Sequence, residues 1–360
     1  MPKLYFDLRI FGMQPFGGIS TQWAAVLRRI EPRFAGFDVT LLLPNARSNI
    51  ALREVSTEGF DVIPAAPIGP YRKYLPNSLV GAPDDVLHPS YYAWYPRFRG
   101  RRVVTVHDFN YELHPNPVIR FAHQRLLHDS VIRGDLIFCV SEFTRGELRK
   151  RYPRLDPARI LVTPNGTDLR YETSGDGTGD YLLWVGGRGP TKRFDDALRF
   201  LALLPEDTSA KTRLVVVGQP FSDRERQRIT EEDLWDRIDL RPRASPAVLT
   251  RLYGDAIALL YLSAHEGFGI PIIEAQACGC PVVARSIPVS REVGGESPLY
   301  LEDITTETVA GAWHRLRHPD SRQKMISVGR TNCTRYSWDD TVRTMVAAYS
   351  SLGNGGAHPA

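Results

Sequence analysis

Within residues 257–284, an apolar segment is followed by a glycine-rich turn, a helical segment and a second apolar segment. The turn and the start of the helical segment read Glu266-Gly267-Phe268-Gly269-Ile270-Pro271-Ile272-Ile273-Glu274. Pro271 suits the first position of a helix, where its missing N–H is no loss. Gly267 and Gly269 let the backbone pass close to a ligand. The order predicts a strand, turn, helix and strand of a parallel sheet, with a helix N-terminus that faces an anion.

Two carboxylates flank this turn. Glu266 is expected at the end of the strand, and Glu274 in the first turn of the helix. Beside free backbone N–H groups, two such acceptors suit a polyol joined to a diphosphate, which is the chemistry of a nucleotide sugar. A structural role is the alternative for Glu274, because a Glu in the first turn of a helix also complements the helix dipole.

The nine-residue string closely resembles the Glu-x7-Glu signature of family 4, a large family of retaining glycosyltransferases with the GT-B fold. The resemblance covers most of the chain; it is closest over residues 181–301 and weakest over 44–100. It implies an α/β protein of GT-B architecture, in which two Rossmann-like, doubly wound domains face a cleft.

The chain also alternates short apolar segments with helical ones, which favours a doubly wound parallel sheet. The expected strands include residues 4–10, 38–43, 102–107, 136–141 and 181–185, and the expected helices include 20–30, 142–151, 194–204 and 223–236.

The length of 360 residues, with 42% hydrophobic and 24% charged residues, suffices for two domains of ordinary composition. By the resemblance we expect an N-terminal acceptor-binding domain over residues 1–170 and a nucleotide-sugar-binding domain over 171–338. A last helix over 339–352 is expected to cross back to the first domain. The polar, glycine-rich segment 173–179 is the expected hinge.

Arg188 and Lys192 lie four positions apart in a glycine-rich loop that follows the expected strand 181–185. The loop resembles the family's Arg-x3-Lys element, which implies that both side chains bind the diphosphate of the donor. Negative charge develops on the leaving phosphate during transfer, and cations that are already in position would stabilise it. The alternative is ordinary surface charge.

His107 ends the expected strand 102–107, at the edge where open α/β sheets bind ligands. It resembles the family's first-domain histidine that meets the donor sugar, whereas an isolated histidine is more often structural. Gly17 and Gly18 follow the first strand and open a helix. This position matches the family's first glycine loop and predicts contact with a phosphate or the acceptor, with a plain turn as the alternative.

The resemblance assigns roles within the glycine-rich turn and beside it. Glu266 is expected to bind sugar hydroxyls, and Glu274 to accept hydrogen bonds from the ribose. Gly267 and the backbone amides of Phe268, Gly269 and Ile270 are expected to meet the sugar and the phosphates. Gly218 and Arg241, at the ends of two further strands, are expected to border the base.

No metal and no cofactor other than the donor substrate is expected. Cys278 and Cys280 lack a second pair of ligands, and the four cysteines are too scattered for a disulfide framework. The Asp-x-Asp pattern of metal-dependent transferases is not found at a suitable strand end, and the cations of the 188–192 loop replace the metal's role.

Charge is unevenly distributed along the chain. Residues 1–170 contain 23 Lys and Arg against 16 Asp and Glu, and the remainder contains 22 against 25. A basic first half suits an anionic membrane surface or a phosphate-bearing acceptor, unless its arginines form only a solvated surface. Nucleic acid is not an expected partner, because the arginines are dispersed and no recognition motif is found. The aromatic run at 91–95 is open to three interpretations: sugar stacking, contact with lipid headgroups, or core packing.

The N-terminus has no signal-peptide pattern, and no apolar stretch reaches the ~18 residues of a membrane span. We therefore expect a cytoplasmic protein; the basic first half leaves open whether it contacts the inner face of the plasma membrane peripherally.

The resemblance implies a retaining transfer of a hexose-type sugar from a nucleoside-diphosphate sugar to a saccharide or lipid-linked saccharide, in the synthesis of a surface polysaccharide such as O-antigen. The block at His107-Asp108 is similar to mannosyl- and rhamnosyl-transferring members, which favours GDP-mannose as the donor. Two alternatives stay open. One is a nucleotide-sugar 2-epimerase with the same fold, and the other is a non-catalytic nucleotide-sugar-binding subunit of an assembly complex.

Overall fold

The computed structural model of the protein describes residues 1–34, 36–45, 49–65, 72–170, 179–205 and 212–353. The chain divides into two compact units. Unit 1 comprises Met1–Gly166 with Trp338–Ala360, and unit 2 comprises Thr167–Ser337. The domain boundary at 170/171 and the hinge at 173–179 stay predictions, because residues 171–178 lie outside the described residues.

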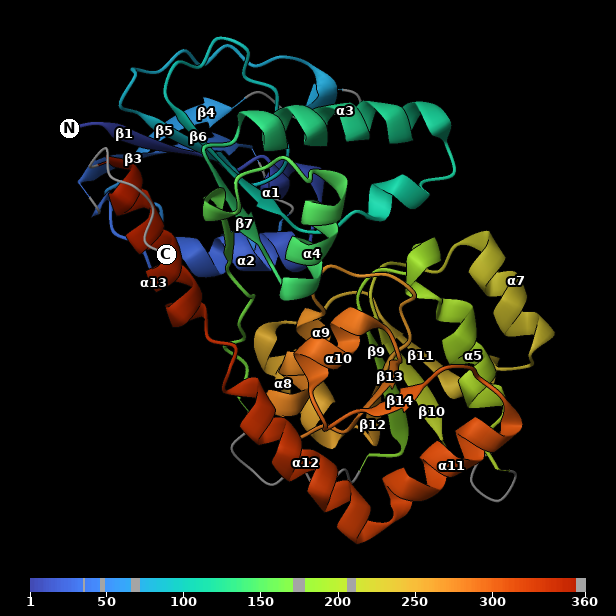
Figure 1. The fold of residues 1–360 in the computed structure, drawn as a ribbon. Helices are drawn as coiled ribbons and strands as arrows, with labels where there is room; N and C mark the ends of the chain where they lie inside the picture. Colours follow the sequence, from blue (N-terminus) through green and yellow to red (C-terminus); the bar gives the residue numbers. More distant parts are fainter. Residues whose placement is uncertain (35, 46–48, 66–71, 171–178, 206–211, 354–360) are drawn as a thin grey trace. The chain divides into compact units, whose positions relative to one another are not determined.

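Unit 1 contains a predominantly parallel sheet (Figure 1). Its strands are β1 (Lys3–Asp7), β2 (Arg33–Phe34), β3 (Phe37–Pro44), β4 (Asp61–Ala65), β5 (Val86–Pro89), β6 (Arg101–Val106), β7 (Leu136–Cys139) and β8 (Ile160–Val162). The spatial order is β2-β3-β1-β5-β6-β7-β8, with β4 paired to β3, and only the β2–β3 pairing is antiparallel among the pairings of the described strands. Strands buried on both faces need continuous apolar sequence, which β7 provides.

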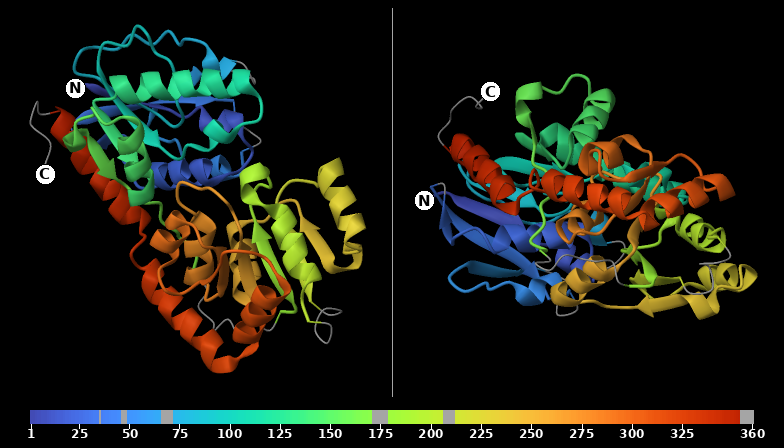
Figure 2. Two further views of the ribbon diagram at one scale, coloured as in Figure 1. Left: turned by 45° about the vertical axis from the view of Figure 1, so that its right-hand side comes forward. Right: turned by 90° about the horizontal axis from the view of Figure 1, so that it is seen from below.

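Helices cover this sheet and complete the core. They are α1 (Ile10–Met13), α2 (Gly18–Leu27), α3 (Pro117–Arg133), α4 (Glu142–Arg151) and α13 (Trp338–Gly353), with the short 3-10 turns η1 (Ala51–Glu54), η2 (Arg72–Tyr74), η3 (Asn110–Leu113) and η4 (Pro157–Arg159). The C-terminal helix α13 lies beside α2 (Figure 2), and Arg29 pairs with Asp339 at 2.6 Å. Val342, Met345 and Tyr349 of α13 join the apolar core of unit 1.

His88 connects α13 to the centre of the unit 1 sheet. The side chain lies at β5 and is fully buried, with Nδ1 2.6 Å from the hydroxyl of Tyr349 and Nε2 2.9 Å from the hydroxyl of Thr105. Burial lowers the pKa of His88 to about 3, so the ring is neutral at physiological pH. Both ring nitrogens are thus satisfied only while α13 is in place.

Unit 2 has a second parallel sheet. Its strands are β9 (Tyr181–Val185), β10 (Arg213–Val217), β11 (Ile238–Arg241), β12 (Ala258–Tyr261), β13 (Val282–Arg285) and β14 (Leu299–Leu301). The spatial order is β11-β10-β9-β12-β13-β14, so the direction of winding reverses between β9 and β12. This 3-2-1-4-5-6 order is that of a Rossmann fold, which binds ligands at the carboxyl ends of the strands where the winding reverses.

The helices and turns of unit 2 are η5 (Pro190–Lys192), α5 (Phe194–Ala202), α7 (Asp223–Glu231), η6 (Trp235–Arg237), α8 (Pro246–Asp255), α9 (Ile270–Ala277), α10 (Pro288–Gly294), α11 (Thr306–Arg317) and α12 (Pro319–Cys333). Local sequence explains several of their ends. Ser245 caps α8 at Val248 N, and Ser222 with Glu225 forms a capping box on α7.

Several predicted element bounds are wrong, among them the helix over 20–30, which is Gly18–Leu27. Strand β1 ends at Asp7 rather than at residue 10, because Ile10 already begins the short helix α1. Strand β7 ends at Cys139, two residues early, because Ser141 serves as the N-cap of α4. The predicted helix over 223–236 ends at Glu231, since Asp233 adopts a left-handed backbone with φ of 50° and a 3-10 turn follows.

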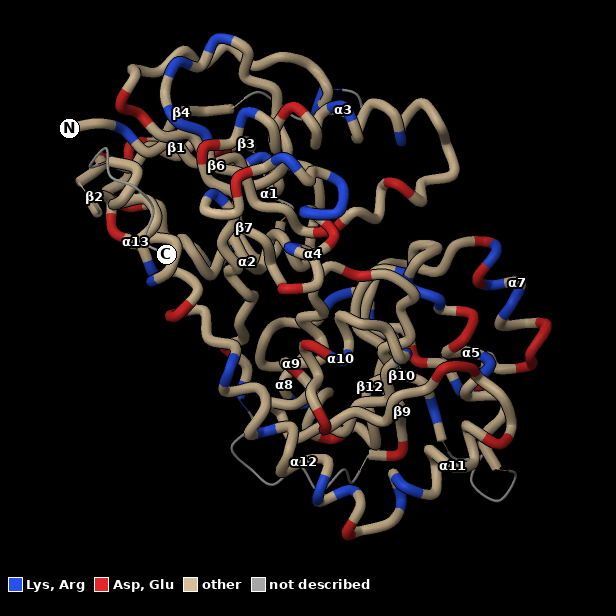
Figure 3. The backbone as a smooth tube through the Cα atoms, viewed as in Figure 1, with Lys and Arg blue, Asp and Glu red and all other residues tan. Residues whose placement is uncertain are grey.

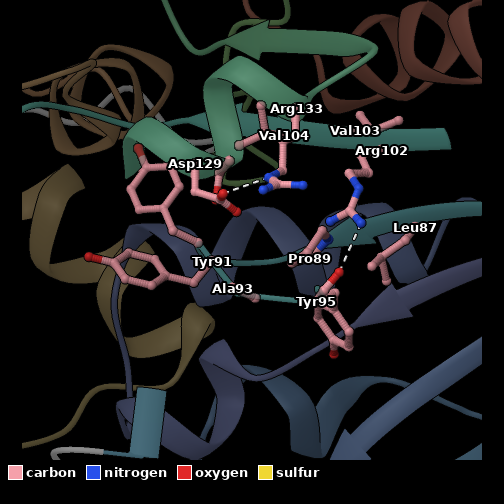
Figure 4. A pocket seen from close by; sticks show the side chains of 12 residues that line it. Leu87, Pro89, Tyr91, Ala93, Tyr95, Arg102, Val103, Val104, Asp129 and Arg133 are labelled. Carbon is pink, nitrogen blue, oxygen red and sulfur yellow. Dashed lines mark hydrogen bonds and ion pairs between the residues drawn. The ribbon is translucent and has the colours of Figure 1, made fainter. Parts of the chain in front are cut away.

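The aromatic run at 91–95 packs mainly in the interior. Tyr91, Tyr92 and Tyr95 are buried. Figure 4 labels Tyr91 and Tyr95, together with Arg102 and the Asp129–Arg133 ion pair. The cavity that they line holds only about 20 Å³, which is room for about one water molecule. The structure therefore favours core packing for these three tyrosines.

We predict that Tyr349→Phe destabilises the protein by about 1–3 kcal/mol, because it leaves Nδ1 of the buried His88 without a partner. Urea unfolding followed by circular dichroism measures the change. Tyr152→Phe is a matched control, since its hydroxyl makes no hydrogen bond among the described residues. An equal effect in both variants would contradict the assigned role of the His88 contact.

Candidate functional site

The loops after β9 and β12 meet where the strand order of unit 2 reverses (Figure 1). The backbone N–H of Ala264 donates to the carbonyl oxygen of Thr191 at 2.8 Å and joins the two loops. Nζ of Lys192 forms a short ion pair with Oε1 of Glu266. The side chain of Glu266 is 9% exposed and that of Lys192 is 33% exposed. Two predicted site residues are therefore in direct contact, with the cation nearer to solvent.

The backbone beside Lys192 is unusual. Arg193 adopts the left-handed conformation, with φ of 59° and ψ of 45°, at the N-cap of α5. For a residue other than glycine this costs about 1–2 kcal/mol. The side chain of Arg193 is held by Asp196 at 2.9 Å. Arg193 thus ends η5 and begins α5 directly after Lys192, which pairs with Glu266.

Tyr261, the last residue of β12, supports Glu266 from within the unit. The phenol is buried and hydrogen-bonded to Glu266, and burial together with the charge of Glu266 raises its pKa well above the usual value. Gly269 passes directly over this hydroxyl: a Cβ at that position would lie 3.1 Å from it, and φ is 119°. Only glycine combines this backbone conformation with so close an approach.

Helix α9 begins at Ile270, directly after Gly269, with Pro271 in its first turn. Its N-terminal N–H groups are therefore presented beside Glu266, as the sequence predicts. Phe268 is buried and packs edge-on against Tyr336 at 5.4 Å, and Gly267 is buried in the same turn. These contacts hold the turn in place and leave its backbone as the part that can meet a ligand.

Glu274 lies one turn further along α9 and is partly exposed. The hydroxyl of Tyr253 donates to Oε2 of Glu274 at 2.9 Å. Burial raises the pKa of Glu274 to about 7, although the bond from Tyr253 favours the ionised form. The carboxyl group thus titrates near physiological pH, and its ability to accept hydrogen bonds depends on pH.

Arg188 is not brought to the Lys192–Glu266 pair. Its side chain is 4% exposed, and Nε donates to Oε1 of Glu225 at 2.7 Å. Nη2 donates to the carbonyl oxygens of Gln219 and Pro220, at 2.7 and 2.9 Å. The guanidinium also lies 4.9 Å from the ring centre of Phe221. Arg188 therefore connects the loop after β9 to the loop after β10.

Gly218 makes this connection possible. A Cβ at position 218 would lie 2.7 Å from the carbonyl oxygen of Gly186 and 2.9 Å from Nη1 of Arg188. Arg188 also lines a pocket of about 370 Å³ between the N-termini of α5 and α7. Arg241, the other residue expected at the base, is 57% exposed and pairs with Asp239 at 2.7 Å.

His107 follows β6 in unit 1 and is 8% exposed. One ring nitrogen bonds to the backbone of Ser90, whereas Nε2 is buried and has no partner among the described residues. Burial lowers the pKa of His107 to about 4, so the imidazole is neutral at physiological pH. A neutral imidazole has one donor and one acceptor nitrogen, so it can form a hydrogen bond with a sugar hydroxyl in either direction.

The glycine pair of unit 1 lies at the start of α2, with Gly17 as the N-cap and Gly18 as the first helical residue. The side chain of Gln14 donates to the hydroxyl of Ser20 at 2.7 Å, and Asn49 donates to the carbonyl oxygen of Gln14 at 2.7 Å. A Cβ at Gly17 would lie 2.6 Å from Nε2 of Gln14. The glycine therefore lets the Gln14 side chain lie against its own loop, and contact with a ligand stays a prediction.

The four cysteines are free and buried. Within the described ranges, no group of three or more His, Cys, Asp or Glu side chains is placed to hold a metal ion. Nor do the described residues form a helix long and apolar enough to cross a membrane.

Two family models match consecutive parts of the chain. The model described as Glycosyltransferase Family 4 matches residues 16–171, and the model described as Glycosyl transferases group 1 matches residues 168–297. Both models describe parts of the same enzyme family, and together they cover most of the sequence.

The chain belongs to the family 4 glycosyltransferases.

Curated relatives agree with this assignment. O-antigen chain mannosyltransferase B of Escherichia coli is 27% identical over 301 residues, with 75% of each chain covered. O-antigen chain mannosyltransferase RfbU of Salmonella typhimurium is 29% identical over 242 residues, with 66% of each chain covered. A D-inositol 3-phosphate glycosyltransferase of Acidothermus cellulolyticus is 32% identical over 217 residues, covering 54% of this chain and 48% of the relative. The matched region thus spans about half the length of that last protein.

Solved structures confirm the predicted GT-B fold. WaaG, a glycosyltransferase involved in lipopolysaccharide biosynthesis, superposes with a TM-score of 0.70 at 16% identity, covering 98% of this chain and 100% of WaaG. Anabaena Alr3699/HepE in complex with UDP and glucose superposes with a TM-score of 0.72 at 16% identity, with 98% and 100% covered. At this level of identity the likeness concerns the fold alone.

Sequence reasoning missed three residues that shape this candidate site. Tyr261 and Tyr253 hold the two motif carboxylates, and Glu225 holds Arg188. Tyr261 was detectable as the last residue of a strand directly before the motif. Tyr253 and Glu225 belong to other helices, and only the packing of α8 and α7 brings them to the site.

We predict that Gly218→Ala destabilises the glycosyltransferase by about 1–3 kcal/mol, because its methyl group would overlap the Gly186 carbonyl and the Arg188 side chain. Gly187→Ala is the matched control, since a Cβ there meets nothing within 4 Å. Guanidinium unfolding of both variants measures the difference. Equal stabilities of the two variants would contradict the prediction, because the structure would then accommodate the added methyl group at position 218 without cost.

We further predict that nucleotide affinity rises with pH through Glu274. The pKa of Glu274 is about 7, so the fraction of Glu274 that is ionised rises about tenfold from about pH 6 to about pH 8. The hydrogen bonds that the carboxylate accepts from the ribose should become more populated in the same proportion. Isothermal titration with GDP and UDP measures the ratio of wild-type to Glu274→Gln affinity at each pH. Titration of the nucleotide's own phosphate cancels in that ratio. A ratio independent of pH would contradict the assignment of Glu274.

Proposed function

We propose that this family 4 glycosyltransferase moves a hexose from a nucleoside-diphosphate sugar to a hydroxyl of a saccharide or lipid-linked saccharide, with retention of anomeric configuration. The observation that carries the proposal is the Lys192–Glu266 pair at the reversal of the unit 2 sheet, next to the N-terminus of α9. A cation, a carboxylate and free N–H groups at one place match a diphosphate joined to a polyol.

In the proposed reaction the bond between the anomeric carbon and the phosphate oxygen breaks, while the bond to the acceptor oxygen forms on the same face of the sugar. The proton of the acceptor hydroxyl passes to the leaving phosphate. Lys192 and the amides of Phe268, Gly269 and Ile270 would stabilise the charge that develops on that phosphate. Glu266 would accept hydrogen bonds from sugar hydroxyls and thereby orient the ring.

The remaining predicted residues receive supporting roles. Glu274 would bind the ribose hydroxyls, and Gly218 and Arg241 would border the base. His107 would exchange a hydrogen bond with the sugar through its unpartnered Nε2. Arg188 would bind the diphosphate only if its guanidinium left Glu225. In its present position its role is to hold the loop after β9 in shape.

The relatives guide the choice of substrates. Two of them are O-antigen chain mannosyltransferases, which supports a mannosyl donor and an acceptor in surface polysaccharide synthesis. GDP-mannose is accordingly the first donor to test, and UDP-sugars the second, because a structural neighbour was solved with UDP. We propose that no metal ion takes part, since Lys192 supplies a cation where the leaving phosphate would lie. A lipid-linked acceptor would place the enzyme at the inner face of the plasma membrane.

Nucleotide binding is the first test of this proposal. Thermal shift with GDP, UDP, ADP and dTDP, with and without chelator, should single out one nucleotide that raises Tm whether or not chelator is present. The absence of any shift would argue against an intact donor site and favour the non-catalytic subunit. Conversion of the nucleotide sugar into its 2-epimer in the absence of an acceptor would identify the epimerase.

We predict that Lys192→Ala lowers kcat by roughly 100-fold or more with the correct donor and acceptor, as expected on loss of one electrostatic stabiliser. Arg199→Ala is the matched control, because Arg199 is an exposed cation of α5 with no ion-pair partner among the described residues. Product configuration is read by NMR. Unchanged turnover in the Lys192→Ala, Arg188→Ala double variant, or an inverted product, would refute the proposed mechanism.

A further inference from the structure

A group of large apolar side chains is exposed on one part of unit 1. Leu113 of η3 is 58% exposed, and Val118 and Phe121 at the start of α3 are 74% and 65% exposed. Val118, Phe121 and Arg125 are spaced three and four residues apart and so share one face of the helix. The opposite face of α3 is packed into the core by His123, Leu126, Leu127 and Val131. We call Leu113, Val118, Phe121 and Arg125 the η3–α3 surface; Arg120 lies beside it, on the first turn of the same helix.

The charges of this surface have one sign. Arg125 and the neighbouring Arg120 are exposed and have no ion-pair partner among the described residues. Figure 3 marks the Lys and Arg positions of the backbone, those of α3 included, in blue. Between residues 110 and 128 the only acidic residue is Glu112. Both of its carboxylate oxygens are taken by Arg151, at 2.7 and 2.6 Å. The exposed apolar side chains are therefore flanked by cations alone.

The surface is also held rigidly. Tyr111 of η3 stacks on His123 of α3, with ring centres 3.8 Å apart and planes 7° apart. Lys73 of η2 lies 5.2 Å from the ring centre of Tyr111 and adds another cation next to α3. Unit 1 as a whole carries 23 Lys and Arg against 17 Asp and Glu. A partner therefore meets a preformed apolar and cationic surface on a basic unit.

We propose that the η3–α3 surface docks on an anionic lipid bilayer. Arginines beside exposed Val, Leu and Phe suit the boundary between lipid headgroups and acyl chains, where the cations meet anionic headgroups and the apolar groups insert. A second copy of this chain fits less well, because a two-fold contact through this face would bring Arg125 against its own copy. The inference goes beyond the proposed function, since lipid binding is measured without donor or acceptor.

Vesicle co-sedimentation tests the proposal with the full chain, using phosphatidylcholine vesicles with and without phosphatidylglycerol. We expect the wild type to bind only the vesicles that contain phosphatidylglycerol. Arg120→Gln with Arg125→Gln should weaken the partition by roughly 20-fold. Val118→Gln with Phe121→Gln should weaken it by roughly 10-fold or more. Ile132→Gln is the matched control, because Ile132 is 49% exposed on the same helix, about 16 Å beyond Phe121 and beside Asp129.

Four outcomes would overturn the proposal: no binding by the wild type, equal binding to both vesicle types, unchanged binding in both double variants, or an equal loss in Ile132→Gln. Circular dichroism and nucleotide thermal shift of each variant show that folding and the donor site are intact. Sedimentation velocity of the Val118→Gln, Phe121→Gln variant identifies a contact between copies instead, if a wild-type dimer dissociates while lipid binding stays the same. Loss of the donor site with intact vesicle binding would refute the proposed function alone.

Discussion

The ion pair between Lys192 and Glu266 is the contact on which the candidate site of unit 2 depends. A carboxylate that is 9% exposed needs a partner, and removing one member of a buried pair costs more than the pair itself contributes. A ligand that separates the two groups must therefore replace both partners at once. A diphosphate can replace the carboxylate beside Lys192, while sugar hydroxyls can donate to Glu266. The same molecule then satisfies both, which is a physical reason for a nucleotide sugar rather than a free phosphate or a free sugar.

Side chains outside the signature hold this pair and its neighbours in position. Tyr261 and Tyr253 are buried phenols that each bond to one motif carboxylate. Gly269 turns the chain over Tyr261 with φ of 119°, and Arg193 turns it after Lys192 with φ of 59°. Strained backbone and buried phenols thus occur where two loops must place charged groups opposite each other.

Much of the fold and part of the site could be predicted from the sequence. The string from Glu266 to Glu274 combines strand end, glycine turn and helix start within nine residues, so local rules suffice to place it. The direction in which Arg188 points could not be predicted, because it depends on Glu225, which is 37 residues away on α7. The same holds for the His88–Tyr349 contact, which joins residues 261 positions apart. The spacing of residues in the sequence identified the candidate side chains, whereas the packing of the fold determines which of these side chains are in contact.

Burial shifts the pKa of three histidines of unit 1 and the pKa of Glu274 of unit 2 in opposite directions. It lowers the pKa of His88, His107 and His123 to about 3, 4 and 3, and it raises the pKa of Glu274 to about 7. The stability contributed by the neutral histidines is complete above their unfolded pKa of about 6.5, and it is lost as pH falls below that value. The stability contributed by protonated Glu274 is complete below about 4.5 and is lost as pH rises towards 7. A fall in pH therefore lowers the stability of unit 1 through these three histidines, whereas it raises the stability of unit 2 through Glu274. Glu274 is thus near its titration point only at pH values where His88, His107 and His123 are already neutral.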